Sequence, residues 1–201
     1  MSDHDDVSVP HAFAATPQLA GTRVLLRRVE VSDAEALAAA VGDLPSSWVT
    51  SVPAPEAMAD EIERRQGLQA AGSMAPFAVV ADGRPVGMTT FMNIDAANRR
   101  VEIGSTWLSP AVQGTGVNAE AKLLLLTRAF EALECIAVEF RTHFHNFQSR
   151  AAIERLGAKP DGVLRSHQLF NGVLRDTAVY SIIACEWTTV KRGLEHRLAG
   201  R

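Results

Sequence analysis

Hydrophobic and polar residues in the first half of the chain follow the two periods of regular secondary structure. Short apolar runs bounded by Gly, Pro and Asp are typical of strands, and apolar residues three or four positions apart are typical of helices. The stretch that begins near Pro55, for example, has Met58, Ile62 and Leu68 along one helical side. In chain order the sequence predicts a strand at 22–29, helices at 33–41 and 55–71, and strands at 77–81, 85–92 and 100–108.

The second half of the chain begins with a strongly apolar helix. Its apolar residues form one wide stripe from about residue 117 to 133, which is typical of a helix pressed into a sheet with little exposure to solvent. A strand at 136–142 follows, and it should run parallel to strand 100–108 because a helix connects the two. The remaining predicted elements are a helix at 147–156 capped by Asn146, strands at 163–170 and 176–185, and a short amphipathic helix after 187.

This order of elements, β-α-α-β-β-β-α-β-α-β-β, predicts an α+β fold. The sheet should be mixed but mostly antiparallel, with about seven strands and with helices on both faces. Residues 1–16 are polar and aperiodic, and they are expected to form a mobile tail. Residues 17–187 are expected to form one domain, to which residues 188–201 append the C-terminal helix.

Composition narrows the class of protein without identifying its function. The chain has 201 residues, 47% of them hydrophobic and 21% charged, and its formal net charge of −3 gives no overall reason to expect nucleic-acid binding. It shows no charged-then-apolar leader and no apolar run of about 18 residues, so a soluble cytoplasmic protein is expected. Cys135 and Cys185 both lie in apolar runs and are expected to be buried thiols rather than a disulfide.

The stretch from Gln113 to Ala119 carries the strongest chemical signal. Gly114 and Gly116 permit positive φ angles, so successive backbone N–H groups can turn toward one centre just before a helix begins. The first N–H groups of that helix and the positive end of its dipole add to the same centre, which predicts a site for a phosphate or pyrophosphate. A P-loop is excluded because no Gly-Lys-Ser/Thr follows, and the mixed polarity of the preceding strand disfavours a dinucleotide fingerprint. A simple tight turn is the alternative.

Several short motifs follow one another between residues 17 and 187. They are Pro17-x-Leu19-x-Gly21, Glu102-Ile-Gly, Trp107-Leu-Ser-Pro110, Gln113-Gly-Thr-Gly-Val-Asn-Ala-Glu-Ala121, Asn146-x-x-Ser149, Leu156-Gly157, and Gly172 followed by Arg175-Asp176. In this order and spacing the chain resembles the GNAT acyltransferases, in the branch that contains the ribosomal-protein N-terminal acetyltransferases. The acyl-CoA loop of that family reads Gln/Arg-x-x-Gly-x-Gly/Ala, and Gln113, Gly116 and Asn118 occupy its three defined positions. Asn118 departs from the small residue expected, although Asn is acceptable at a helix start.

The resemblance implies an acyl-CoA donor and assigns residues to it. Backbone N–H groups of residues 114–119 would bind the CoA pyrophosphate, the backbone around Leu108 would pair with the pantetheine arm like an added strand, and Asn146 would hydrogen-bond the pantetheine. The implied donor-binding residues are therefore Leu108, Gln113, Gly114, Thr115, Gly116, Val117, Asn118, Ala119 and Asn146. Acetyl-CoA is the default donor, a bulkier acyl-CoA stays open, and no metal is expected.

Two residues are candidates for acid–base catalysis. Many members of the family protonate the departing thiolate with a Tyr four residues before the Gly that ends the helix after Asn146. Here that position is Ile153, and the only Tyr is Tyr180 in the last strand. Ser149, which the resemblance places near the thioester sulfur, is then the candidate acid, and Glu102 is the candidate base, acting through a water. The alternatives are a polar residue in a first helical turn for the former and a solvated strand carboxylate for the latter.

The predicted function is transfer of an acyl group, acetyl by default, from acyl-CoA to a primary amine by direct attack in a ternary complex. The amine could belong to a protein N-terminus, a small molecule or a polyamine, although no acidic cluster favours a polyamine. A non-catalytic acyl-CoA-binding sensor and a generic phosphate-ligand-binding protein are the alternatives. His143, His145 and His167 do not have the spacing of a metal site. Neither nucleic acid nor a membrane is an expected partner, and a homodimer is compatible with the need to cover edge strands.

Overall fold

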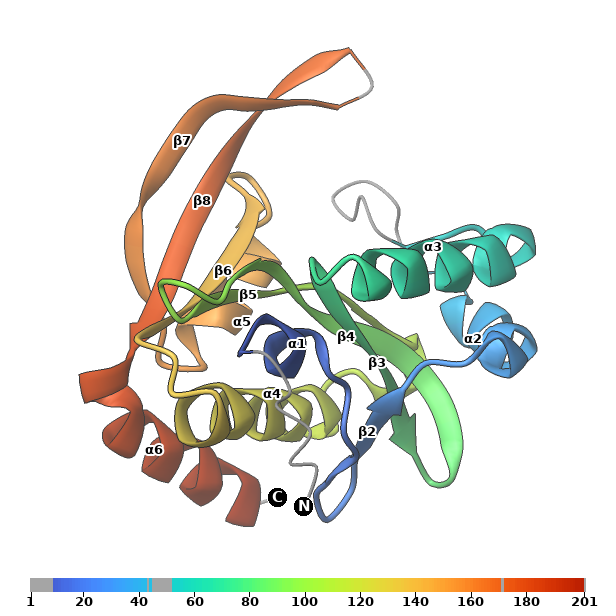
Figure 1. The fold of residues 1–201 in the computed structure, drawn as a ribbon, viewed down its shortest axis with the longest axis horizontal. Coiled ribbons are helices and arrows are strands. Elements are labelled where there is room, and N and C mark those ends of the chain that lie inside the picture. Colours follow the sequence, from blue (N-terminus) through green and yellow to red (C-terminus); the bar gives the residue numbers. More distant parts are fainter. Residues whose placement is uncertain (1–8, 43, 45–51, 171, 201) are drawn as a thin grey trace, which may run out of the picture.

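The computed structural model describes residues 9–42, 44, 52–170 and 172–200. The strands are β1 (Leu19–Ala20), β2 (Leu25–Arg28), β3 (Met74–Ala81), β4 (Arg84–Asp95), β5 (Arg100–Leu108), β6 (Ala137–His143), β7 (Lys159–Phe170) and β8 (Val173–Ile183). The α-helices are α1 (Val9–Ala14), α2 (Ala34–Val41), α3 (Met58–Ala70), α4 (Val117–Thr127), α5 (Phe147–Glu154) and α6 (Trp187–Ala199). Short 3₁₀ turns lie at Val31–Asp33, Pro55–Ala57, Pro110–Val112 and Ala184–Glu186, and a π-helical turn, Arg128–Ala132, continues α4. The strands form one sheet of eight in the order β1-β2-β3-β4-β5-β6-β8-β7 (Figure 1).

The predicted α+β fold with a mixed, mostly antiparallel sheet is confirmed, with one strand more than the seven expected. The additional strand is β1, whose two residues pair with β2 and are too few to leave a pattern in the sequence. Residues 9–14 of the predicted tail form α1, and Phe13 is only 2% exposed. Ordered packing therefore reaches further toward the N-terminus than predicted, while residues 1–8 lie outside the described residues.

The strand pairings explain why the turn signals were informative. Asp82 and Gly83 join β3 to β4 with φ angles of 48° and 74°, as an Asp-Gly hairpin turn requires. β5 and β6 are parallel as predicted, and every other pair of neighbouring strands in the described sheet is antiparallel. In the turn predicted between β7 and β8, Gly172 has a φ of 78°, whereas Asn171 lies outside the described residues.

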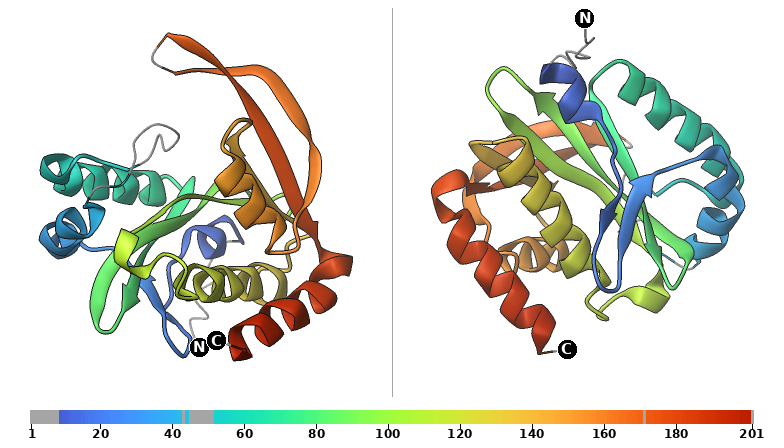
Figure 2. Two further views of the ribbon diagram at one scale, coloured as in Figure 1. Left: turned by 180° about the vertical axis from the view of Figure 1, so that it is seen from behind. Right: turned by 60° about the horizontal axis from the view of Figure 1, so that its bottom comes forward.

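The sheet separates two groups of buried apolar side chains. The larger group lies between the sheet and α1, α4, α5 and α6, where Leu125 of α4 is fully buried. The smaller group lies under α2 and α3, where Ile62 is fully buried. β3 belongs to both groups because its successive side chains point to opposite faces, with Phe77 in the first group and Ala78 in the second. Helices therefore cover both faces of the sheet, as predicted (Figure 2).

A fork between β5 and β6 is the feature that creates the site. The two strands pair over only three residues each, and the last pair is Glu102 with Glu139. Beyond it the strands diverge, which leaves one edge of β5 without a strand partner in the described sheet (Figure 1). A β-bulge further along β5 places Ser105 and Thr106 opposite Thr89 of β4, and Ser105 has a φ of 46°. Polar backbone groups of β5 are thus presented to an open space.

The surface of the molecule differs from the prediction at one cysteine. Both cysteines are free, and Cys135 is buried as predicted, but Cys185 is exposed.

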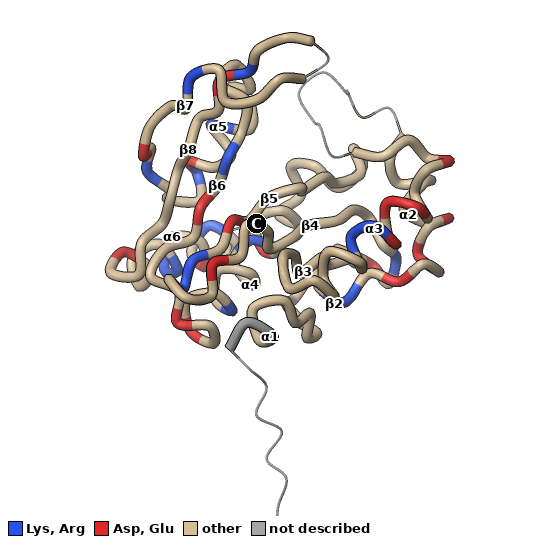
Figure 3. The backbone as a smooth tube through the Cα atoms, turned by 45° about the horizontal axis from the view of Figure 1, so that its top comes forward, with Lys and Arg blue, Asp and Glu red and all other residues tan. Residues whose placement is uncertain are grey.

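Acidic and basic positions are interspersed along the backbone (Figure 3). β7 and β8 form a long hairpin that projects beyond the body of the protein, and all twelve residues of β7 are exposed (Figure 1). No helix in the described residues is long and apolar enough to cross a membrane.

Candidate active site

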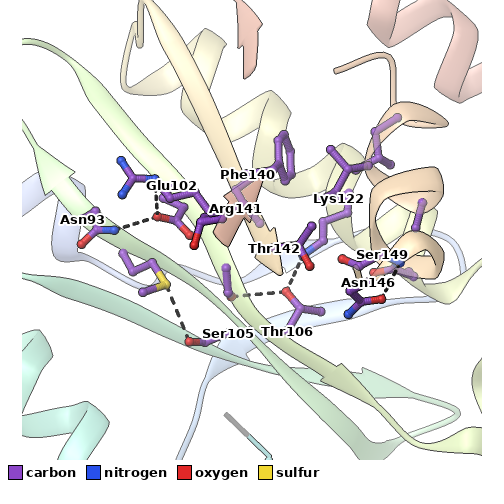
Figure 4. A pocket seen from close by; sticks show the side chains of 18 of the residues that line it. Asn93, Glu102, Ser105, Thr106, Lys122, Phe140, Arg141, Thr142, Asn146 and Ser149 are labelled. Atoms are coloured by element: carbon purple, nitrogen blue, oxygen red, sulfur yellow. Dashed lines mark hydrogen bonds and ion pairs between the residues drawn. The ribbon is translucent and has the colours of Figure 1, made fainter. Parts of the chain in front are cut away.

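A cavity of about 320 Å³ lies where β5 and β6 diverge (Figure 4). Polar side chains from several elements line it: Glu102 and Thr106 of β5, Asn118 and Lys122 of α4, Arg141 of β6, Asn146 and Ser149 at the start of α5, and His167 and Arg175 of the β7–β8 hairpin. The cavity therefore brings together the predicted catalytic residues and two of the predicted donor-binding residues, which are far apart in the sequence.

The predicted anion loop lies between β5 and α4. Gly114 and Gly116 have φ angles of +78° and +102°, which residues with a side chain rarely adopt. Gly116 is the N-cap of α4, and no side chain caps this end of the helix. The N–H groups of the first turn, residues 117–119, consequently have no acceptor within the helix. The loop thus presents the positive end of α4 in the form that an anion requires.

Some polar groups of the predicted loop are used inside the protein. The N–H groups of Gln113 and Thr115 donate to carbonyls of the preceding 3₁₀ turn at 3.2 and 3.5 Å. The side chain of Gln113 donates through Nε2 to the carbonyl of Leu108 at 3.1 Å. Gln113 therefore ties the loop to the end of β5. The sequence predicted that the backbone N–H groups of all residues from 114 to 119 bind the ligand. The N–H group of Thr115 already donates to a carbonyl of the protein, so it is removed from the predicted set.

Glu102 is a buried carboxylate at the fork. It is 5% exposed, so the alternative of a solvated surface carboxylate is wrong. Asn93 Nδ2 donates to its Oε2 at 2.7 Å, and Nε of Arg141 lies 3.5 Å from the same oxygen. Burial raises the pKa of Glu102, while the Asn93 hydrogen bond and the Arg141 charge act in the opposite direction. A carboxylate with a raised pKa holds a proton more readily, which suits a general base.

The start of α5 forms one wall of the cavity. Asn146 caps the helix as predicted, because its Oδ1 accepts a hydrogen bond from the Ser149 N–H at 3.0 Å. The cap fixes the direction in which α5 leaves β6, and both side chains line the cavity. Ser149 is half-buried, so its hydroxyl is accessible to a ligand that enters the fork.

Many members of the family use a tyrosine to protonate the departing thiolate, but no tyrosine is among the described residues that line this cavity. Ile153 lines the cavity at the position where many members have Tyr. Tyr180 is 1% exposed, donates to Glu154 Oε1 at 3.0 Å and accepts from Arg150 Nε at 2.8 Å. It is not among the residues that line the cavity. Its hydroxyl is therefore committed elsewhere.

The histidines occupy different environments. His167 lines the cavity, with Nδ1 3.1 Å from the hydroxyl of Thr177. His143 and His145 lie with ring centroids 5.6 Å apart, and neither lines the cavity. Within the described ranges, no group of three or more His, Cys, Asp and Glu residues is arranged to hold a metal ion.

Lys122 is a cavity residue that the sequence reading missed. It is 5% exposed, and its Nζ donates to Oγ1 of Thr106 at 2.6 Å and to Oγ1 of Thr89 at 2.9 Å. Burial lowers its pKa to about 7. The wide apolar stripe of this helix hid the residue, although a lysine four positions after Asn118 shares its helical face and could have been noticed for that reason.

Glu120 links the loop helix to the N-terminal strands. Its two carboxylate oxygens accept the backbone N–H groups of Thr22 and Arg23 at 2.7 and 2.9 Å. A Cβ at Gly21 would lie 2.7 Å from Oε1 of Glu120, so only glycine allows this approach without a shift of that carboxylate. Two of the motifs quoted from the sequence are thus in direct contact, and together they position α4.

Comparison with known proteins identifies relatives of this arrangement. A family model described as an acetyltransferase (GNAT) domain matches residues 23–159, which include the fork, the loop and α5. The chain is 37% identical over 106 residues to "Putative ribosomal N-acetyltransferase YdaF" of Bacillus subtilis (strain 168), an alignment that spans 53% of this chain and 57% of that protein. The crystal structure of a GCN5-related N-acetyltransferase from Brucella melitensis has a TM-score of 0.82 and 28% identity, covering 92% of this chain and 86% of that one. Mycobacterium smegmatis RimJ in complex with CoA-disulfide has a TM-score of 0.76 and 26% identity, covering 92% and 93%.

Proposed function

Because the chain belongs to the GNAT acetyltransferase family, we propose that it transfers an acetyl group from acetyl-CoA to the α-amine at the N-terminus of a protein. The observation that carries the proposal is the cavity at the β5–β6 fork. There, Asn118 from the first turn of α4, the unpaired edge of β5 and the buried carboxylate of Glu102 line one space. In a ternary complex the first turn of α4 would bind the diphosphate, the edge of β5 would bind the pantetheine arm, and the carboxylate would act on the amine.

The donor would be held mainly by main-chain groups. The open first turn of α4 supports binding of the CoA pyrophosphate through N–H groups and the helix dipole. The edge of β5 beyond Glu102 supports pairing with the amides of pantetheine, in the manner of an added strand. Bound in this way, CoA would direct its thioester into the cavity.

Two asparagines support the same placement of pantetheine. Oδ1 of Asn118 is buried and has no hydrogen-bond partner among the described residues, and an N–H of the ligand would satisfy it. Asn146 caps α5 through its Oδ1. Its Nδ2 can therefore donate a hydrogen bond to a carbonyl of the ligand. Both residues line the cavity, so both can contact the same extended ligand.

The chemistry requires an amine without its extra proton beside a polarised thioester. An α-amine has a pKa of about 7.7–8.0, so its deprotonation near neutral pH costs much less than that of a lysine side chain at about 10.4. We assign the removal of this proton to Glu102, acting through a water molecule. Ser149 would contact the thioester sulfur from the opposite wall of the cavity.

The charge of the cavity wall favours a peptide over a polyamine. Glu102 is the one acidic residue among the described residues that line it, whereas Arg141 and Arg175 are cationic. A polyamine carries several positive charges and would be repelled, whereas a peptide N-terminus presents one amine followed by neutral amides. The ribosomal description of the Bacillus relative supports the same acceptor class, and a ribosomal protein would place the reaction in the cytoplasm.

Paired peptides test this function. Three separate reactions contain the protein, acetyl-CoA and one acceptor. The acceptors are a peptide with a free N-terminus and one internal lysine, the same peptide blocked at its N-terminus, and spermidine. Products are located by tandem mass spectrometry. We expect one acetyl group on the α-amine of the first peptide and none on the blocked peptide. Acetylation of only lysine or spermidine would contradict the proposed acceptor, and binding of acetyl-CoA without transfer would favour a sensor.

A further inference from the structure

Lys122 reaches the cavity from the second turn of α4. Its Nζ lies 2.6 Å from Oγ1 of Thr106 and 2.9 Å from Oγ1 of Thr89, and these two hydroxyl oxygens lie 2.8 Å apart. The three groups form a closed triangle beside the bulge of β5, and Figure 4 shows the end of Lys122 directed toward Thr106. Two hydroxyls can accept two of the three protons of an ammonium group, which leaves the third for a group that enters the cavity.

No carboxylate in the described part of the chain forms an ion pair with Lys122. The other charged or titratable residues that line the cavity are Glu102, Arg141, His167 and Arg175. Glu102, the sole carboxylate among them, binds Asn93 and Arg141 instead. Burial without a counter-charge lowers the pKa of Lys122 to about 7, so its ammonium form gives up a proton readily near neutral pH.

The proposed reaction needs an acid at this place. When the amide forms, the sulfur of CoA leaves with an electron pair and has to be stabilised or protonated. Ile153 cannot do this, and the hydroxyl of Tyr180 is held by Glu154 and Arg150 away from the cavity. A serine hydroxyl such as that of Ser149 can donate a hydrogen bond, but it does not ionise in the neutral pH range.

We propose that Lys122 is the catalytic acid that protonates the CoA sulfur as it leaves. The inference rests on the proposed function, because it requires acyl-CoA in the cavity. The C–S bond breaks, its electron pair stays on sulfur, and a proton moves from Nζ of Lys122 to that sulfur to give the CoA thiol. The proton lost by the attacking amine passes to Glu102 and then to solvent, and water returns one proton to Lys122. One amine and one thioester give one amide and one thiol, with no net gain of protons.

The surroundings of Nζ suit both states of this cycle. Before transfer, the ammonium donates to Thr89 and Thr106. After transfer, the neutral amine can accept a hydrogen bond from either hydroxyl, because a threonine hydroxyl both donates and accepts. The state left behind is uncharged, which is the state that burial favours. The two threonines therefore hold Nζ in one place without fixing its charge.

The direct test measures ionisation of the thiol of bound CoA. The ultraviolet absorbance of the thiolate is titrated against pH for CoA bound to wild type, Lys122→Met and Lys159→Met, after subtraction of the ligand-free proteins. Lys159 is exposed, paired with Glu186 and outside the cavity, so its variant controls for the loss of one lysine. We expect the thiolate to appear about 1 pH unit or more lower in wild type and in Lys159→Met than in Lys122→Met, because the neutral amine of Lys122 can take up the thiol proton and the ammonium formed in this way stabilises the thiolate.

Single-turnover kinetics with acetyl-CoA give a second readout. The rate of acetyl transfer by Lys122→Met should fall about 100-fold, the lower end of what general acid catalysis contributes, while the Kd for acetyl-CoA stays within about threefold. Lys122→Gln, which keeps a polar group but has no ionisable proton, should show the same loss and serves if the methionine variant does not fold.

The outcomes separate this inference from the proposed function. Equal ionisation of the bound thiol in wild type and Lys122→Met would overturn the assignment, as would near wild-type rates in both folded variants; Lys122 would then be a structural residue. A wild-type protein that binds no CoA would instead refute the proposed function, and the assignment would fall with it.

Discussion

Replacement of Lys122 by Met should change how the stability of the ligand-free protein depends on pH. Burial lowers the pKa of this lysine from 10.5 to about 7 in the folded state, and unfolding restores the ordinary value. Below pH 7 both states carry the proton, and the folded state bears the full cost of a buried charge. Between pH 7 and pH 10.5 the unfolded state binds more protons than the folded state, so the free energy of unfolding of the wild type rises with pH.

The size of this effect follows from the difference of about 3.5 between the two pKa values. At about 1.36 kcal/mol for each pKa unit, it amounts to on the order of 5 kcal/mol over the whole window. From pH 7, where about half of the folded molecules already lack this proton, to pH 9 the expected rise is about 2.3 kcal/mol. Lys122→Met lacks this contribution, so its stability relative to wild type should fall by that amount over the same range. The hydrogen bonds that the variant loses at Thr89 and Thr106 add an offset that is independent of pH.

Urea unfolding followed by circular dichroism at pH 7, 8 and 9 measures the effect. Wild type, Lys122→Met and the surface control Lys159→Met are compared at each pH. The control should stay parallel to wild type, because Lys159 is exposed and its ion pair with Glu186 raises its pKa above this range. A constant difference between Lys122→Met and wild type from pH 7 to pH 9 would refute the reasoning, since it would mean that Lys122 keeps its proton in the folded protein.

Three further predictions concern separate parts of the structure. Glu102→Gln should lower kcat/KM most at low pH, where less of the amine is already neutral, and an unchanged pH–rate profile would remove Glu102 from the mechanism. In urea unfolding, Gly67→Ala should stabilise α3 by about 0.5–1 kcal/mol, because nothing lies within 4 Å of the added Cβ. Gly87→Ala should destabilise by about 1–3 kcal/mol, because its Cβ would lie 2.2 Å from a backbone carbonyl oxygen of β5; similar effects of the two changes would contradict this packing. A thiol reagent should label exposed Cys185 in the folded protein and Cys135 only after unfolding, since burial raises the pKa of Cys135 to about 11; two labels on the native protein by mass spectrometry would disprove this.

The fold could be predicted where a local pattern has one explanation. The Asp82-Gly83 turn defined the β3–β4 hairpin, and the apolar stripe of α4 required a buried helix, which in turn made β5 and β6 parallel. β1 and α1 escaped because they have two and six residues, too few for a period to be seen. Their order comes from tertiary contacts, such as the burial of Phe13 in the larger core, which no local pattern reports.

The sequence predicted those residues of the site that belong to short motifs, which can be recognised without the fold. Glu102, Asn146 and Ser149 line one cavity, as expected if they act together, and their roles stay predictions. Lys122 was missed because its chemistry depends on burial against two threonines from other elements, and burial of a single lysine leaves no local trace. Cys185 was wrongly expected to be buried for a related reason. Its apolar neighbours in the sequence belong to the end of β8 and the start of α6, and the 3₁₀ turn between them exposes the thiol.

Two buried basic side chains contact the bulge at Ser105 and Thr106 from opposite faces of the sheet. Adjacent threonines of β4 point to opposite faces, so Thr90 accepts from Nη1 of Arg65 at 3.1 Å on the α3 side, and Thr89 accepts from Lys122 on the α4 side. Arg65 also lies 3.5 Å from the carbonyl oxygen of Ser105. A bulge disrupts the strand ladder locally, and these bonds replace contacts that the ladder cannot make. Since the open edge of β5 begins beyond Glu102 and includes this bulge, both helical layers set the position of the strand along which the thioester would lie. A change in the packing of α3 would therefore reach the reacting atoms through Arg65, although α3 contributes no residue to the cavity.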